Sequence, residues 1–159
     1  MAFALSTMKL TSTDFDNNGS IPSKHTGEGE DISPALSWSD APKGTESFAV
    51  ICHDPDAPLI SPGGTYGFVH WVLYNIPAGV SSLPEGTGDY TNGKTDFGKC
   101  EYGGPMPPNR HGNHRYYFWV IALKAAPQLP PGLSLWELLE KIEPHAIGMN
   151  RLVGTYERD

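Results

Sequence analysis

The chain has 159 residues, with 11 Lys and Arg against 18 Asp and Glu and a formal net charge of −7. This length suits one domain over residues 1–159, and the lack of any basic cluster argues against binding to nucleic acids or anionic membrane surfaces. No run reaches the roughly 18 apolar residues of a membrane span. The N-terminus also lacks the basic and apolar regions of a signal peptide, so we expect a cytoplasmic protein.

Short apolar or alternating runs recur along the chain and are separated by turn residues, as is typical of β-strands. The expected strands are Phe3–Leu10, Ala35–Trp38, Phe48–His53, Phe68–Ile76, Arg115–Leu123 and Arg151–Tyr156. Cys52 lies in the third run and is expected in the core, with no disulfide to Cys100.

Two of these runs carry large side chains at both alternate sets of positions, which predicts central strands covered on both faces. In the first, Phe68, His70, Val72 and Tyr74 are expected to share one face. In the second, the expected shared face is that of His114, Tyr116, Phe118 and Val120.

One helix is expected near the C-terminal end of the chain. Ser134 and Glu137 form an S-x-x-E capping box before the apolar stripe of Leu135, Leu138, Leu139 and Ile142, and Pro144 should end the helix. Many strands with one or two short helices predict a mainly β protein, an antiparallel β-sandwich.

The motif D-P-D-A-P at positions 54–58 follows a buried strand directly. Its prolines fix the backbone, so the loop could aim the carboxylate of Asp54 at a ligand. The plainer interpretation is a turn in which Asp54 and Asp56 cap their own backbone.

His70 lies in an otherwise apolar strand. A buried histidine there must either find hydrogen-bond partners within the protein or serve a function. From the residue alone, both interpretations stay open.

The segment Y-G-G-P-M-P-P-N-R-H-G-N-H-R-Y-Y-F occupies positions 102–118. Gly103 and Gly104 could present backbone N–H groups to an anion, beside His114 and Tyr116 on one strand face. The alternative is a long hairpin loop with incidental polar residues. Arg115 points the other way and suits a structural ion pair, while His25, His111 and His145 are expected to be solvated.

Taken together, D-P-D-A-P, H-W-V-L-Y-N-I-P, G-G-P and G-x-H-R-Y-Y-F resemble the phosphatidylethanolamine-binding protein (PEBP) family, which includes the Raf kinase inhibitor protein, and its bacterial YbhB/YbcL-like branch. The resemblance implies an antiparallel β-sandwich with a small pocket for phosphate-like anions. The pocket residues that it implies are Asp54, Asp56, Pro58, His70, Gly104, Pro105, His114 and Tyr116. It also implies a cis peptide bond between Ala57 and Pro58.

We therefore expect a binding protein for a small phosphate-like anion or phospholipid headgroup, with no cofactor and no enzymatic activity. Hydrogen bonds would come from His70, His114, Tyr116 and the glycine loop, while Asp54 orients a histidine. Binding should tighten at mildly acidic pH, where imidazoles become charged.

Other functions stay open at this point. Asp54, His70 and His114 make a set of two histidines and one carboxylate that could hold a transition metal in an enzyme. A regulatory or inhibitor module with a protein partner is also compatible with an anion pocket, as is a homodimer. A serine hydrolase is disfavoured because the chain has no G-x-S-x-G motif.

Overall fold

The computed structural model describes residues 3–57 and 67–159. The strands are β1 (Lys9–Thr11), β2 (Gly19–Ser20), β3 (Leu36–Ser39), β4 (Ser47–Asp54), β5 (Phe68–Pro77), β6 (Ser82–Leu83), β7 (Thr91–Asn92), β8 (His114–Leu123) and β9 (Ala146–Tyr156). The helix α1 spans Leu135–Ile142, and 3₁₀ turns occupy Ser23–His25 and Glu143–His145.

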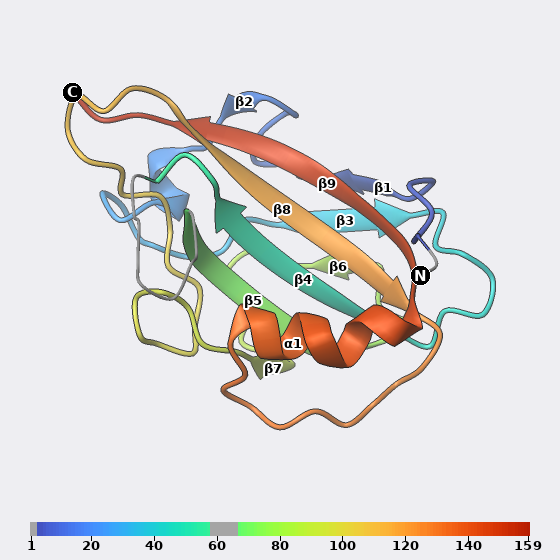
Figure 1. Cartoon of the computed structure of the whole chain (residues 1–159). Helices are drawn as coiled ribbons and strands as arrows, with labels where there is room; N and C mark the ends of the chain where they lie inside the picture. Colours follow the sequence, from blue (N-terminus) through green and yellow to red (C-terminus); the bar gives the residue numbers. More distant parts are fainter. Residues whose placement is uncertain (1–2, 58–66) are drawn as a thin grey trace.

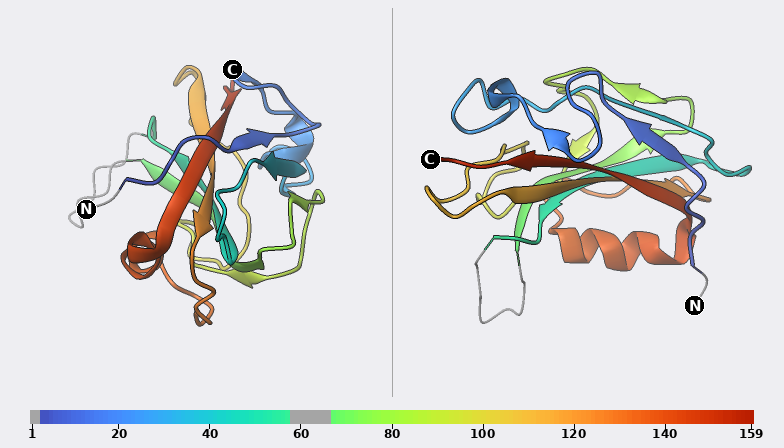
Figure 2. Two further views of the ribbon diagram at one scale, coloured as in Figure 1. Left: turned by 90° about the vertical axis from the view of Figure 1, so that its right-hand side faces the viewer. Right: turned by 90° about the horizontal axis from the view of Figure 1, so that it is seen from above.

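The strands form two sheets, a three-stranded sheet of order β1-β3-β6 and a six-stranded sheet of order β2-β9-β8-β4-β5-β7. Neighbouring strands run antiparallel, except that β2 pairs with β9 in parallel at the edge of the large sheet. The small sheet lies over one face of the large sheet and α1 lies on the other face (Figures 1 and 2). The predicted mainly β sandwich with a short helix is confirmed.

The two faces of the large sheet carry separate apolar clusters. Between the sheets, Phe118 and Val120 of β8 pack with Trp71 of β5 and Trp38 of β3. On the other face, Leu138 of α1 packs in the second cluster. Because β4, β5 and β8 are covered on both sides, they form a packed frame for the polar side chains at their ends.

The helix begins as the sequence predicts. The Ser134 hydroxyl accepts from the Glu137 N–H, and the Glu137 carboxylate accepts from the Ser134 N–H. The α-helix ends at Ile142, and Pro144 lies in the 3₁₀ turn that follows. Trp136 on the outer side of α1 is 55% exposed. Among the described residues, no helix has the length and the hydropathy that a membrane crossing requires.

The predicted strand Phe3–Leu10 is wrong over most of its length. Leu5 makes a single parallel bridge to Gly148 of β9, and only Lys9–Thr11 forms a strand, paired with β3. The segment crosses from the large sheet to the small one, so no single neighbour can pair with all of it.

The predicted alternation along β5 is also wrong after His70. Cys52 pairs with Trp71 and His53 pairs with Val69, which leaves His70 as the extra residue of a β-bulge. A bulge shifts the following side chains by one position, so Val72 packs in the cluster under α1.

Candidate functional site

A pocket of about 280 Å³ opens where β4 ends, β5 begins and β8 begins. Its polar side chains come from three strands of the large sheet, and the loop that follows Gly104 closes it. The lining residues are Asp54, Ala57, Phe68, His70, Phe97, Met106, Pro107, Pro108, His114 and Tyr116. Four residues of the predicted site therefore converge on one cavity, although they lie up to 62 positions apart (residues 54 and 116).

Asp54 and His114 form a buried pair at the centre of this site. Nδ1 of His114 lies 2.7 Å from Oδ2 of Asp54, and each side chain is 2% exposed. The other oxygen of Asp54 accepts from the Asp56 N–H at 2.7 Å, so the carboxylate also caps its own loop. A carboxylate accepts only, so His114 donates from Nδ1 and its Nε2 is the atom left for another partner.

That partner is His111, an exposed residue of the loop before β8. Nδ1 of His111 lies 2.7 Å from Nε2 of His114. A neutral His114 accepts here from the Nδ1–H of His111, which completes a carboxylate–imidazole–imidazole chain from the buried end of β4 to the surface.

His70 is fixed by the bulge that holds it and by a backbone carbonyl. Its Nδ1 donates to the Gly103 carbonyl at 2.7 Å, so Nε2 is free to meet a ligand. Burial lowers the pKa of His70 below its ordinary value, because desolvation disfavours the charged imidazolium. The ring stands edge-to-face with Tyr116, with ring centroids 5.1 Å apart.

Tyr116 lies on the same face of β8 as His114 and is 1% exposed. Burial raises the pKa of its hydroxyl, so the group stays protonated and can donate to a ligand. The predicted shared face of β8 is confirmed, because Tyr116, Phe118 and Val120 pack in the cluster between the sheets and His114 lines the pocket with Tyr116.

Asp56 lies outside the pocket lining. Its carboxylate binds Arg115 in a bidentate pair, with Nη2–Oδ1 at 2.8 Å and Nε–Oδ2 at 2.9 Å. These hydrogen bonds lower the pKa of the Asp56 carboxyl. Asp56 therefore anchors the loop to β8, and Arg115 forms the structural ion pair expected of it. Pro58 and the predicted cis bond between Ala57 and Pro58 lie outside the described residues.

The predicted anion-binding role of the glycine pair is wrong. The N–H of Gly103 donates to the His70 carbonyl at 3.0 Å, and the N–H of Gly104 donates to Asp31 at 2.6 Å. Both groups are used within the protein and do not face the pocket. Pro105 does not line the pocket either, and its carbonyl accepts from Gly27.

The glycines instead allow close packing. A Cβ at Gly103 would lie 2.3 Å from the ring of Phe97, and a Cβ at Gly104 would lie 2.2 Å from the His25 carbonyl. Residue 104 must therefore be glycine for the loop to pack here.

Sequence reasoning did not identify the apolar walls of the pocket. Phe97 stands edge-on to Phe68, with ring centroids 4.7 Å apart, and Met106, Pro107 and Pro108 close the other side. Nothing in the local sequence around Phe97 indicates this position. His111 was expected to be solvated, yet it contacts His114, three residues ahead in the sequence.

The alternative metal centre is not formed by the pocket residues. Across 3–57 and 67–159, Asp14, His25 and Glu85 are the one group of three possible ligands whose donor atoms lie within 4.8 Å of one another. Asp54, His70 and His114 do not make such a group.

The sequence and the fold are similar to those of known proteins. The family model "Phosphatidylethanolamine-binding protein" matches residues 11–157. A UPF0098 protein of Aquifex aeolicus is 42% identical over 160 residues, which cover 96% of this chain and 90% of that protein.

Two crystal structures show the same fold. The putative PEBP homolog CT736 of Chlamydia trachomatis superposes with a TM-score of 0.88 at 37% identity, covering 96% of this chain and 98% of the other. YbcL of E. coli, described as a member of the mammalian PEBP family, gives a TM-score of 0.86 at 32% identity, with coverages of 96% and 99%. The chain belongs to the phosphatidylethanolamine-binding protein family.

Proposed function

We propose that the protein binds a small organic phosphate ester, or an anion of similar charge, in the pocket of Asp54, His70, His114 and Tyr116. The observation that carries this proposal is the buried Asp54–His114 pair, which opens into a cavity shared with His70 and Tyr116. The family description, with its phosphate-containing lipid, supports the same ligand class.

Each polar residue has a defined part in this binding. Tyr116 donates its hydroxyl hydrogen, and His70 donates from Nε2 once its ring is protonated. His114 likewise donates from Nε2 only when its ring is also protonated and His111 has moved aside, while Asp54 holds the His114 ring in place. Charge-assisted hydrogen bonds of this kind contribute roughly 1.5–3 kcal/mol each.

The pocket has no Lys or Arg among its described lining residues. Positive charge for the anion must therefore come from the imidazoles, so binding takes up protons. Because burial disfavours the charged form of His70 by lowering its pKa, little of the free protein carries this charge at neutral pH, and the charged fraction grows as the pH falls. Affinity should rise from pH 8 towards pH 5.

The apolar walls favour an anion that carries an organic substituent. Phe68, Phe97 and Met106 offer surface that inorganic phosphate cannot cover, whereas the hydrocarbon part of an ester would bury it. An alkyl or aryl phosphate should therefore bind more tightly than inorganic phosphate.

We propose binding rather than turnover. Within the described lining, Asp54 is the one carboxylate, and both of its oxygens already accept hydrogen bonds. It is therefore poorly placed to attack a phosphorus atom. Incubation with phenyl phosphate should release no phosphate above the uncatalysed background.

Calorimetric titration tests the proposal with phosphorylethanolamine and with sulfate across pH 5–8. Sulfate stays a dianion over this range, so any pH dependence in its binding comes from the protein. Y116F should weaken both ligands, whereas Y117F, the neighbour that points to the other face of β8, should not. Sulfate affinity that is flat or rises with pH, or an unchanged Y116F, would contradict the proposal.

A further inference from the structure

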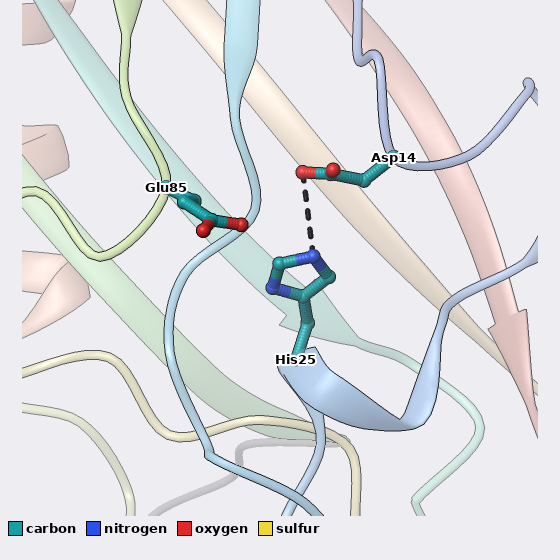
Figure 3. A group of neighbouring side chains, drawn as sticks. All are labelled: Asp14, His25 and Glu85. Carbon is teal, nitrogen blue, oxygen red and sulfur yellow. Dashed lines mark ion pairs between the residues drawn. The ribbon is translucent and has the colours of Figure 1, made fainter.

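A second cluster of polar side chains lies away from the anion pocket. Asp14 follows β1, His25 ends the first 3₁₀ turn and Glu85 follows β6. The three side chains point toward one another (Figure 3), and one donor atom of each lies within 4.8 Å of the others. His25 was expected to be solvated, but it is 1% exposed.

The contacts of His25 leave its Nε2 facing a carboxylate, with no hydrogen-bond donor opposite it. Nδ1 lies 2.9 Å from the Ile32 carbonyl, which only accepts, so Nδ1 carries the hydrogen. Nε2 then faces Oδ2 of Asp14 at 3.3 Å. In a neutral imidazole this places a lone pair against a carboxylate, an arrangement that a cation between the two would stabilise.

The spacing of these two atoms suits a metal ion. Zinc bonds to imidazole nitrogen and carboxylate oxygen are about 2.0–2.2 Å long, so two ligands in a tetrahedral arrangement lie about 3.3–3.5 Å apart. The separation of 3.3 Å between His25 and Asp14 falls in this range. Asp14 is held in place because its Oδ2 also accepts from the Ala35 N–H at 2.8 Å.

Glu85 would complete the set from the solvent side. Its carboxylate now binds the Lys24 ammonium at 2.7 Å, and both side chains are more than 40% exposed. An exposed pair of this kind contributes little to stability. Lys24 can therefore leave and free the Glu85 carboxylate for a cation.

We propose that Asp14, His25 and Glu85 form a binding site for a divalent transition-metal cation of the zinc class. One imidazole and two carboxylates suit such a borderline cation. Calcium and magnesium prefer oxygen ligands throughout, and the imidazole argues against them.

A cation at this site would stabilise the segment that leads to the wall of the anion pocket. The His25 carbonyl accepts from the Tyr102 hydroxyl at 2.7 Å, and the Pro105 carbonyl accepts from the Gly27 N–H at 2.9 Å. Residues 102–105 lead into the pocket wall at Met106 and Pro107. Metal binding should therefore raise the melting temperature of the whole protein.

The test is calorimetric titration of chelator-treated protein with zinc chloride, together with thermal melts. The wild type should bind one zinc ion with micromolar affinity and melt at a higher temperature with zinc. Removing a residue that hydrogen-bonds to a metal ligand lowers metal affinity about 10- to 100-fold. D14N and E85Q each alter a ligand itself, so each should lower zinc affinity at least as much. Both substitutions preserve size and shape.

Two further variants keep the experiment decisive. K24M removes the competing ammonium and leaves the three ligands intact, so it should bind zinc more tightly than the wild type. H114N removes the pocket imidazole and should bind zinc like the wild type. The proposal is overturned if the wild type binds no zinc, if K24M gains no affinity, or if H114N loses binding that D14N and E85Q retain. In those cases the contact between His25 and Asp14 is a structural pair and not part of a metal site.

Discussion

Nδ1 of His114 donates to Oδ2 of Asp54 across 2.7 Å, in a pair with 2% exposure on each side. The two residues lie at adjoining ends of β4 and β8, so the antiparallel pairing of these strands brings them together. This pair fixes the His114 ring so that its Nε2 is the atom available for binding.

Removing one member of the pair should be costly. H114A leaves the Asp54 carboxylate buried without its partner, and breaking a buried pair in this way costs about 3–5 kcal/mol of unfolding free energy. Urea denaturation of H114A at pH 7 measures this loss. The double variant D54N/H114A buries no charge, so it should be more stable than H114A alone. If the double variant is less stable, the carboxylate is not the source of the cost.

His70 should make the stability of the free protein depend on pH. Burial lowers the folded-state pKa of His70 below the ordinary value of 6.5. The unfolded chain therefore binds the proton more readily, and stability is retained above about pH 6.5 but falls as the pH drops below it. H70N keeps a donor for the Gly103 carbonyl but does not titrate, so its stability should fall less between pH 7 and pH 5.

Urea unfolding of the wild type and H70N at several pH values gives this comparison. Sulfate should restore part of the lost stability of the wild type at pH 5.5, because the anion binds the protonated ring. If the stability of the two proteins falls in parallel with pH, His70 is not the group responsible for the pH dependence.

Asp56 should contribute to the stability of its loop and not to the affinity for the anion. Its pair with Arg115 is partly exposed, with 57% of the arginine side chain accessible, so D56N should cost about 1 kcal/mol or less. Since Arg115 lowers the pKa of Asp56, this small contribution is present above the unfolded value of 3.8 and is lost as the pH falls below it. Sulfate affinity of D56N should match the wild type. A large loss of sulfate affinity in D56N would mean that Asp56 contributes to anion binding.

His111 should compete with the anion for His114. In the free protein, its Nδ1 occupies the position from which Nε2 of His114 would reach a ligand. H111A removes a hydrogen bond of about 0.5–1.5 kcal/mol, so sulfate should bind about two- to tenfold more tightly. Asn113 is exposed on the same loop, and N113A should leave affinity unchanged. Weaker binding by H111A would mean that His111 itself contacts the anion.

Local sequence patterns were sufficient to predict several elements of the fold. Alternation along β8 placed His114 and Tyr116 on one face, and the capping box at Ser134 placed the start of α1. The motif resemblance extended this to the family, the fold and the convergence of Asp54 and His70 on the same pocket. These features are readable because strand period and helix caps involve residues only a few positions apart.

The partners of the backbone hydrogen bonds, in contrast, depend on how the whole chain packs. The N–H groups of Gly103 and Gly104 could have served an anion, but His70 and Asp31 accept from them. The bulge at His70, the wall at Phe97 and the burial of His25 depend in the same way on partners that are remote in the sequence. A buried polar group must be satisfied by whichever partner the packed chain brings to it, and no local pattern specifies that partner.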